Sequence, residues 1–418
     1  MSNTQGLARR LGTFDAVVIG LGSMIGAGVF AAFTPAAQAA GSGLLIGLAV
    51  AAFVAYCNAT SSAQLAAAYP TSGGTYVYGR ERLGPWPGFL AGWGFVVGKV
   101  ASSAAMAMTF AAYAAPAGWE RPVAIAAVVL LVAVNYTGVS RTASLARIIV
   151  FAVLAALAIA VAAVWAGHPG ITGATLLGGG LLSHGWYGIL QSAGLLFFAF
   201  AGYARIATLG EEVRDPRRTI PRAILLALAI AAAVYACVGL TLLASLGPDG
   251  VATNPAPLAA AVASGPGAWA APVVRIGAAL ASLGALLALV AGLGRTSLAM
   301  ARESDLPRWF AAVHPRFKVP HRAEMALGAV ICVIIAFADL RGAIGFSSFG
   351  VLVYYLVANV SAFTQGGADR RYPRFLQLLG AAACVVLVAT LPVGAVAAGL
   401  VMFAVGIGYR FLRLRRSR

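Results

Sequence analysis

The chain has 418 residues, of which 61% are hydrophobic and only 10% carry a charged side chain. An ordinary soluble domain is about 45–50% apolar and about 25% charged, so this chain has too little charge to cover a soluble surface. A protein surrounded by lipid needs charged side chains only where it meets water. The composition excludes a soluble globular protein and indicates an all-α integral membrane protein that crosses the bilayer several times.

Apolar stretches of about 20 residues, the length that crosses a hydrocarbon core of about 30 Å, recur along the chain. We predict twelve spans, over residues 14–39, 43–68, 87–115, 121–140, 144–166, 184–210, 221–246, 268–300, 322–338, 342–363, 374–391 and 393–411. The first span is longer than the apolar part of a signal peptide and further spans follow it, so we expect it to be retained.

The basic residues lie mostly on one side of the predicted membrane. With the N-terminus in the cytoplasm, 23 of the 29 Lys and Arg residues fall in cytoplasmic segments and only three, Arg121, Arg275 and Arg341, fall on the opposite side. The other three, Lys99, Arg205 and Arg295, lie within the spans. This asymmetry follows the positive-inside rule and predicts an inner or plasma membrane protein with both termini in the cytoplasm. It also argues against nucleic-acid binding, although the net charge is +17, because the basic residues form a rim and not a groove.

Glycine indicates where the spans are irregular. The first span carries Gly20, Gly22, Gly26 and Gly28 around Ser23. Because glycine lowers helix propensity by about 1 kcal/mol per residue, this cluster favours a local break, although close helix packing is the alternative. The sixth span carries the run Phe198-Ala-Phe-Ala-Gly-Tyr203. Two breaks that lie five spans apart indicate a transporter built from two five-helix repeats.

The chain carries four longer motifs: Gly22-Ser-Met-Ile-Gly-Ala-Gly-Val-Phe30, Tyr69-Pro-Thr-Ser-Gly-Gly-Thr-Tyr-Val-Tyr78, Phe197 to Tyr203 followed by Glu211 to Pro221, and Ala299-Met-Ala-Arg-Glu-Ser-Asp-Leu-Pro307. In this order they resemble the amino acid permeases of the amino acid/polyamine/organocation superfamily. The resemblance covers nearly the whole chain.

The resemblance implies a five-plus-five inverted repeat of the LeuT-like kind, with discontinuous helices 1 and 6, and secondary transport by alternating access. The implied organisation is a cytoplasmic N-terminus (1–13), a first repeat (14–166), a second repeat (184–363), two peripheral helices (374–411) and a basic cytoplasmic tail (412–418).

A broken helix leaves backbone N–H groups for a carboxylate and carbonyl groups for an ammonium, which suits a zwitterionic amino acid. We expect Gly26, Ala27 and Gly28 to supply N–H groups. The resemblance supports the same positions and adds Phe200 or Tyr203 as an aromatic gate, with core packing as the alternative for either ring. The predicted substrate site comprises Ser23, Met24, Ile25, Gly26, Ala27, Gly28, Phe198, Phe200, Ala201, Gly202 and Tyr203.

Lys99 lies about twelve residues into the third span, near the bilayer midplane. An ionisable residue at this depth is a functional candidate. We expect Lys99 to meet backbone carbonyls at the breaks, to carry a proton or to receive a substrate carboxylate. The alternative is a structural role in a water-filled crevice. Proton-coupled relatives carry a lysine in the fifth span, where this chain has Val153. We therefore predict that Lys99 supplies that cation from the third span.

Arg205 follows the predicted break in the sixth span. Many relatives have an acidic residue one position earlier, where this chain has Ala204, and this difference argues against cationic substrates. We expect Arg205 to form a cytoplasmic gate or a structural ion pair with Glu211 or Glu212.

The four cysteines and four histidines show no metal-ligand spacing, and no catalytic cluster lies within the spans. The prediction is a transporter and not an enzyme, with no cofactor and no metal. Its expected partners are the bilayer, a neutral or acidic amino acid, and protons or a second amino acid in exchange. A carrier of amines or polyamines, and a nutrient sensor derived from a transporter, are the alternatives.

Overall fold

A computed structural model describes residues 11–71, 73–137, 143–167 and 180–416. Within these ranges the chain is almost entirely helical and forms no strand, apart from one isolated bridge between Leu11 and Val213. Nine helical stretches of the described residues are long and apolar enough to cross a membrane. The predicted all-α membrane fold is therefore confirmed, whereas the count of twelve spans and the internal repeat stay predictions.

The described helices follow the predicted spans closely. The first half of the chain forms α1 (Thr13–Met24), α2 (Ala27–Ala31), α3 (Phe33–Ala40), α4 (Leu44–Ala68), α5 (Gly74–Leu83), α6 (Pro85–Ala114), α7 (Glu120–Tyr136) and α8 (Ala143–Gly167). The second half forms α10 (Gly185–Phe200), the 3-10 turn η2 (Ala201–Tyr203), α11 (Ala204–Ala207), α12 (Pro216–Thr253), α13 (Pro257–Ala263), α14 (Ala271–Arg302), α15 (His321–Phe337), α16 (Leu340–Phe363), α17 (Arg374–Thr390) and α18 (Val393–Arg416).

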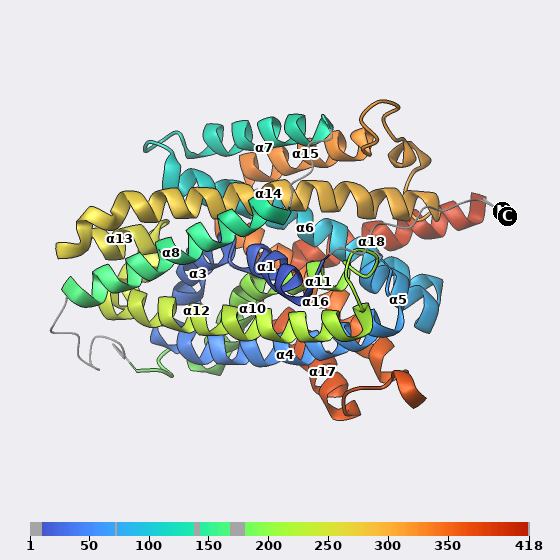
Figure 1. Cartoon of the computed structure of the whole chain (residues 1–418), viewed down its shortest axis with the longest axis horizontal. Coiled ribbons are helices and arrows are strands. Elements are labelled where there is room, and N and C mark those ends of the chain that lie inside the picture. Colours follow the sequence, from blue (N-terminus) through green and yellow to red (C-terminus); the bar gives the residue numbers. More distant parts are fainter. Residues whose placement is uncertain (1–10, 72, 138–142, 168–179, 417–418) are drawn as a thin grey trace.

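Two groups of helices pack around the middle of the molecule (Figure 1). In one group, α4, α10 and α12 contact one another, and α1 packs on α12. In the other, α6, α7, α14 and α15 contact one another. Helix α8 packs on both α1 and α14, and α16 packs on both α4 and α6, so these two helices join the groups. The two halves of the first broken helix, α1 and α2, both contact α14 of the second group, and α2 also contacts α6.

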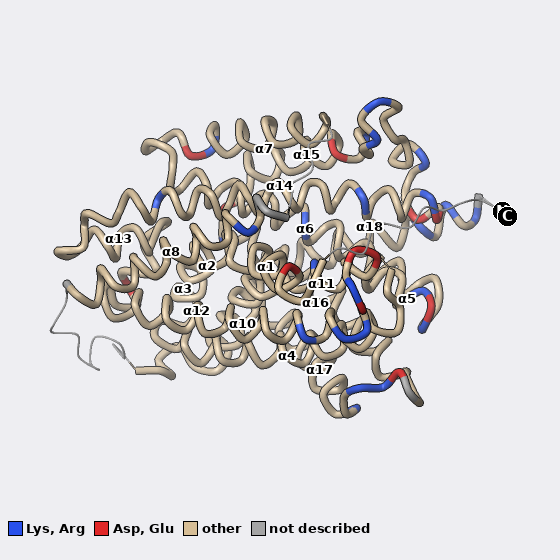
Figure 2. The backbone as a smooth tube through the Cα atoms, viewed as in Figure 1, with Lys and Arg blue, Asp and Glu red and all other residues tan. Residues whose placement is uncertain are grey.

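Charged side chains gather at one end of the molecule, around α5, the loop between α14 and α15, and the last turns of α18 (Figure 2). This end is the cytoplasmic end in the predicted orientation. The concentration of charge there agrees with a body whose middle lies in lipid. Which side of the membrane it faces stays a prediction.

Candidate functional site

The first span breaks where the glycine cluster predicts. Helix α1 ends at Met24, and α2 begins at Ala27. Between them Ile25 (φ −81°, ψ 36°) and Gly26 (φ −84°, ψ −133°) leave the helical conformation. The break exposes the last carbonyls of α1 and the first N–H groups of α2, as any helix terminus does.

The sixth span is less open than the sequence predicts. Helix α10 ends at Phe200, and the chain continues through η2 into the short helix α11. The backbone φ and ψ angles at the two ends of η2, at Phe200 and Ala204, are those of a right-handed helix. The segment therefore forms a tighter helical turn and does not unwind. A 3-10 turn still shifts the hydrogen bonds from the α-helical register and interrupts the helix at this point.

The two interrupted helices touch at the positions of two glycines. A Cβ at Gly202 would lie 2.6 Å from the amide nitrogen of Met24 and would collide with the carbonyl of Ser23. A Cβ at Gly28 would lie 2.6 Å from the Cα of Ala199. Only glycine lets the backbones approach this closely, so the contact depends on these two positions. We call it the crossing.

Lys99 of α6 reaches the crossing. Its side chain is only 7% exposed, and its Nζ lies 3.5 Å from the carbonyl oxygen of Ala201 in η2. The hydroxyl of Ser103 donates to the carbonyl of Lys99 at 2.9 Å, one turn further along the same helix. Lys99 therefore lies beside one backbone carbonyl of the interrupted sixth span, and its role in transport stays a prediction.

Two tyrosines that the sequence analysis did not select also contact the crossing. The Tyr235 hydroxyl of α12 lies 2.6 Å from the carbonyl oxygen of Met24 and 2.9 Å from that of Ala199. The Tyr355 hydroxyl of α16 lies 3.4 Å from the carbonyl oxygen of Ala201. The contacts of Tyr235 with Met24 and of Tyr355 with Ala201 join residues more than 150 positions apart, and that of Tyr235 with Ala199 spans 36 positions, so no local sequence signal predicts them.

A cavity of about 250 Å³, which we call the central cavity, extends from the crossing to the charged end of the molecule. Ser23, Lys99, Phe198 and Ala201 are among the residues that line it near the crossing, and Tyr76 is among those near the charged end. Its size is somewhat below the range of about 300–1,000 Å³ that is usual for ligand pockets, which suits a small solute.

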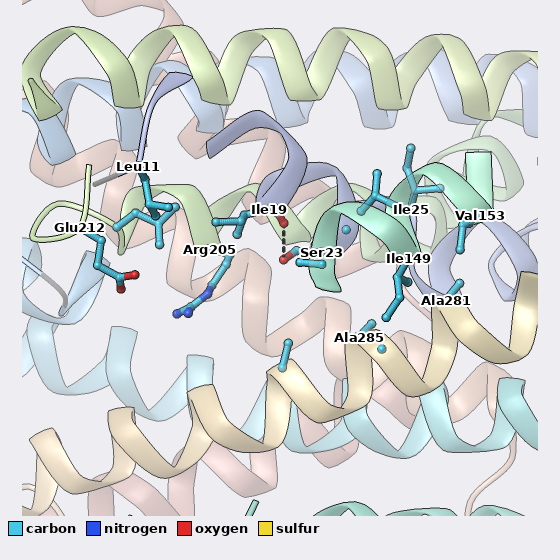
Figure 3. A pocket seen from close by; sticks show the side chains of 16 residues that line it. Leu11, Ile19, Ser23, Ile25, Ile149, Val153, Arg205, Glu212, Ala281 and Ala285 are labelled. Carbon is cyan, nitrogen blue, oxygen red and sulfur yellow. Dashed lines mark hydrogen bonds between the residues drawn. The ribbon is translucent and has the colours of Figure 1, made fainter. Parts of the chain in front are cut away.

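A second cavity of about 190 Å³ lies between α1, α8 and α14 (Figure 3). Val153 and Ile149 of α8 lie on one side of it, and Arg205 and Glu212 on the other. The position that carries lysine in proton-coupled relatives is thus apolar here and faces a space beside the break of the first span.

The structure distributes the predicted site residues unequally. Of the predicted positions, Ser23, Ile25, Lys99, Phe198, Ala201, Gly202 and Arg205 line at least one of the two cavities. The predicted positions at the break itself are buried and lie outside both linings: Met24, Gly26, Ala27 and Gly28. Phe200 and Tyr203 are instead fully buried: Phe200 packs edge-on against Tyr235 with ring centroids 4.9 Å apart, and Tyr203 stacks on Tyr355 at 5.0 Å. These two rings therefore pack in the core, which is the alternative to a role as an aromatic gate. The acidic residue that lines the cavities with Arg205 is Glu212, and Glu211 lies outside both linings.

A buried ionic cluster lies at the charged end around Asp305, whose side chain is 5% exposed. Asp305 accepts hydrogen bonds from Tyr76 at 2.8 Å, from Arg80 at 3.0 Å and from Arg410 of α18. Arg410 also lies over the rings of Trp86 and Phe89. Burial and the hydrogen bond to Asp305 raise the pKa of Tyr76, so its phenol keeps its proton. The cluster joins α5, the start of α6, the end of α14 and α18.

The sequence profile of the amino acid permease family matches residues 11–411. The chain belongs to the amino acid permease family. An uncharacterized transporter of Mycobacterium tuberculosis is 60% identical over 415 residues, which cover 99% of this chain and 93% of that protein. The chloroplastic cationic amino acid transporter 7 of Arabidopsis thaliana is 29% identical over 85% of this chain and 65% of its own length. The branched-chain amino acid permease BcaP of Bacillus subtilis is 25% identical over 91% and 85%.

Membership in this family makes the chain a multi-pass membrane transporter with a small-molecule substrate, and not an enzyme. The predicted family, fold class and transport activity are confirmed. The relatives carry names with different substrates, so they leave the substrate of this permease to be argued from its own residues.

Proposed function

We propose that this permease is a secondary active transporter of neutral or acidic amino acids, which works by alternating access and is coupled to protons or to the exchange of a second amino acid. The observation that carries the proposal is the crossing, where two interrupted helices meet beside the buried ammonium of Lys99. Helix interruptions at mid-membrane depth are the usual sites of substrate binding in transporters with internal repeats.

The crossing offers both kinds of group that an amino acid needs. Ala27 and Gly28 at the start of α2 carry N–H groups that have no partner within their own helix, and Lys99 adds a cation. The carbonyl of Ala201 lies beside Lys99, and the carbonyl of Met24 accepts a hydrogen bond from Tyr235. A carboxylate and an ammonium on one carbon atom match these two sets of groups, which is why an α-amino acid is the proposed solute.

The arrangement of the cavities supports alternating access. The central cavity reaches from the crossing to Tyr76 at the charged end, which is the cytoplasmic end in the predicted orientation. On the other side of the crossing, Tyr113 of α6 donates to the carbonyl of Phe30 at 3.1 Å, and the two rings pack edge to face. Both side chains are fully buried. We interpret the structure as an inward-facing state with its outer path closed.

Cationic substrates fit this site poorly. Lys99, Arg205 and Arg295 line the central cavity, whereas Glu212 is its one acidic lining residue among the described residues. A second cation in such a cavity is repelled, and the repulsion is strong where the dielectric constant is low. The cavity therefore favours neutral or acidic amino acids over amines, polyamines and basic amino acids.

Uptake of a panel of labelled amino acids into proteoliposomes tests the proposal. One arm imposes an inward proton gradient, and the other preloads the vesicles with unlabelled amino acid. Saturable uptake that responds to the gradient supports proton coupling, and uptake that requires preloading supports exchange. The proposal fails if no amino acid enters faster than into protein-free liposomes in either arm, while the reconstituted protein remains monodisperse on extraction.

A further inference from the structure

The carbonyl groups at the crossing already have donors from the protein. The carbonyl oxygen of Ala201 lies 3.5 Å from Lys99 Nζ and 3.4 Å from the Tyr355 hydroxyl. The single hydroxyl of Tyr235 lies between the carbonyls of Met24 and Ala199. A substrate ammonium that approaches Ala201 therefore meets a resident ammonium at the same acceptor.

Lys99 is the cation of the central cavity that lacks a compensating charge. Arg205 is repelled by Arg295 and attracted by Glu212, and Arg295 is attracted by Glu324, although neither arginine forms an ion pair with another described residue. For Lys99, no carboxylate of the described part of the chain forms an ion pair or acts from nearby. Lys99 is also one of only two lysines, whereas the chain uses arginine for almost all of its positive charge.

Charge balance in the closed site limits the substrate. During alternating access the crossing must be sealed from water on both sides, and a net charge sealed there is unfavourable. A neutral zwitterion next to protonated Lys99 leaves one positive charge. A dicarboxylic amino acid next to Lys99 leaves none. We infer that the preferred substrate is a dicarboxylic amino acid whose additional carboxylate pairs with Lys99, an inference that rests on the proposed function.

The geometry at Ala201 allows Lys99 to pair with the carboxylate without leaving the carbonyl of Ala201 unsatisfied. A separation of 3.5 Å is at the long limit of a hydrogen bond, so the contact between Lys99 and Ala201 is weak. A carboxylate forms a shorter, charge-assisted hydrogen bond with an ammonium and competes well for Lys99. The carbonyl of Ala201 is then left for the α-ammonium of the substrate. Each charged group of the substrate thereby gains a partner of opposite polarity.

Arginine and glutamine at position 99 separate this role from that of a proton carrier. Arginine keeps its positive charge in proteins, so it can pair with a carboxylate but cannot release a proton. Glutamine removes the charge and keeps a polar side chain of similar reach. Lys318, the other lysine, lies in the loop between α14 and α15, and Lys318→Gln removes the same charge far from the crossing.

The decisive comparison is between each dicarboxylic amino acid and its amide, which have the same shape and differ in one charge. We expect counterflow in proteoliposomes to favour glutamate over glutamine, or aspartate over asparagine, by at least about tenfold in kcat/KM, which is ~1.4 kcal/mol. Lys99→Gln should bring the ratio close to one, Lys99→Arg should keep it, and Lys318→Gln should leave it unchanged.

The outcomes distinguish a failure of the inferred preference for dicarboxylic amino acids from a failure of the proposed amino acid transport. Equal or better transport of the amides by the wild-type protein overturns the inference and leaves the proposed function standing. So does an acid preference that survives in Lys99→Gln. Absence of transport for every amino acid overturns the proposed function and the inference together. If Lys99→Gln is not recovered as a folded protein, the wild-type ratio and the thermal stabilisation of the wild type by glutamate against glutamine decide.

Discussion

Gly202 in η2 lies directly on the backbone of Ser23 at the end of α1, so closely that a Cβ at position 202 would come within 2.6 Å of the following amide nitrogen. The two interrupted helices therefore cross in direct backbone contact. This contact, together with Lys99, sets the geometry of the proposed substrate site.

We expect Gly202→Ala to reduce transport strongly and to destabilise the protein by about 1–3 kcal/mol, because the added methyl group overpacks the crossing. Gly394→Ala is the control, since an added Cβ there meets no atom within 4 Å. Counterflow and thermal unfolding in detergent measure the two effects. Gly202→Ala with wild-type flux would show that the crossing tolerates separation of its two helices.

Tyr235→Phe removes the hydroxyl that lies between the carbonyls of Met24 and Ala199 and keeps the ring that packs against Phe200. The loss of a buried hydrogen bond costs about 1–3 kcal/mol when an acceptor is left unsatisfied. We expect transport to fall about tenfold, a change of ~1.4 kcal/mol. Tyr56→Phe on α4, where the side chain is 41% exposed, should change nothing. Equal transport rates for both variants would show that the Tyr235 hydroxyl does not contribute to transport.

Phe198 and Phe200 should respond differently to truncation, because Phe198 lines the central cavity and Phe200 lies in the core. We expect Phe200→Ala to lower the free energy of unfolding by about 3–5 kcal/mol. Phe198→Ala should instead raise the KM for transport with a smaller loss of stability. Thermal unfolding and concentration-dependent uptake provide the two measurements. The reverse pattern would mean that the wrong ring has been placed at the cavity.

Asp305→Asn removes the charge that balances Arg80 and Arg410 at the charged end. Breaking a buried ion pair costs about 3–5 kcal/mol, because the remaining charge stays buried without a partner. Here that charge is Arg410, since Arg80 keeps its ion pair with Glu303. Asp249→Asn is the control, since that side chain is exposed and forms no ion pair with the other described residues. Equal thermal stability of the two variants would show that the cluster around Asp305 contributes no net stability.

Much of the fold could be predicted because membrane helices leave a strong local signal. The apolar lengths place α4 and α16 within a few residues of the predicted ranges, and the glycines around Ser23 locate the break of the first span. Helix α5 was missed because it is short and polar, and α13 because it is only seven residues long. Neither has the length that marks a span.

The site was harder to predict because it depends on contacts between distant segments. Lysine is unusual within an apolar span, so Lys99 could be selected from its residue type. Gly202 could be selected because it lies in a motif that resembles the permease family. Tyr235 and Tyr355 are ordinary aromatic residues in apolar helices, and only the packing of α12 and α16 brings their hydroxyls to the crossing. Phe198 and Phe200 are two positions apart, and which of them reaches the cavity depends on the rotation of α10.

The central claim is that an amino acid crosses the membrane through the central cavity, and a filled cavity tests it most directly. Gly292 of α14 lines this cavity, and a Cβ there meets no atom within 4 Å, as is also true of Gly408 on α18. We would measure counterflow of a labelled amino acid in Gly292→Trp and in Gly408→Trp. The account predicts that Gly292→Trp abolishes flux and that Gly408→Trp retains it. Equal flux through both variants would contradict the claim.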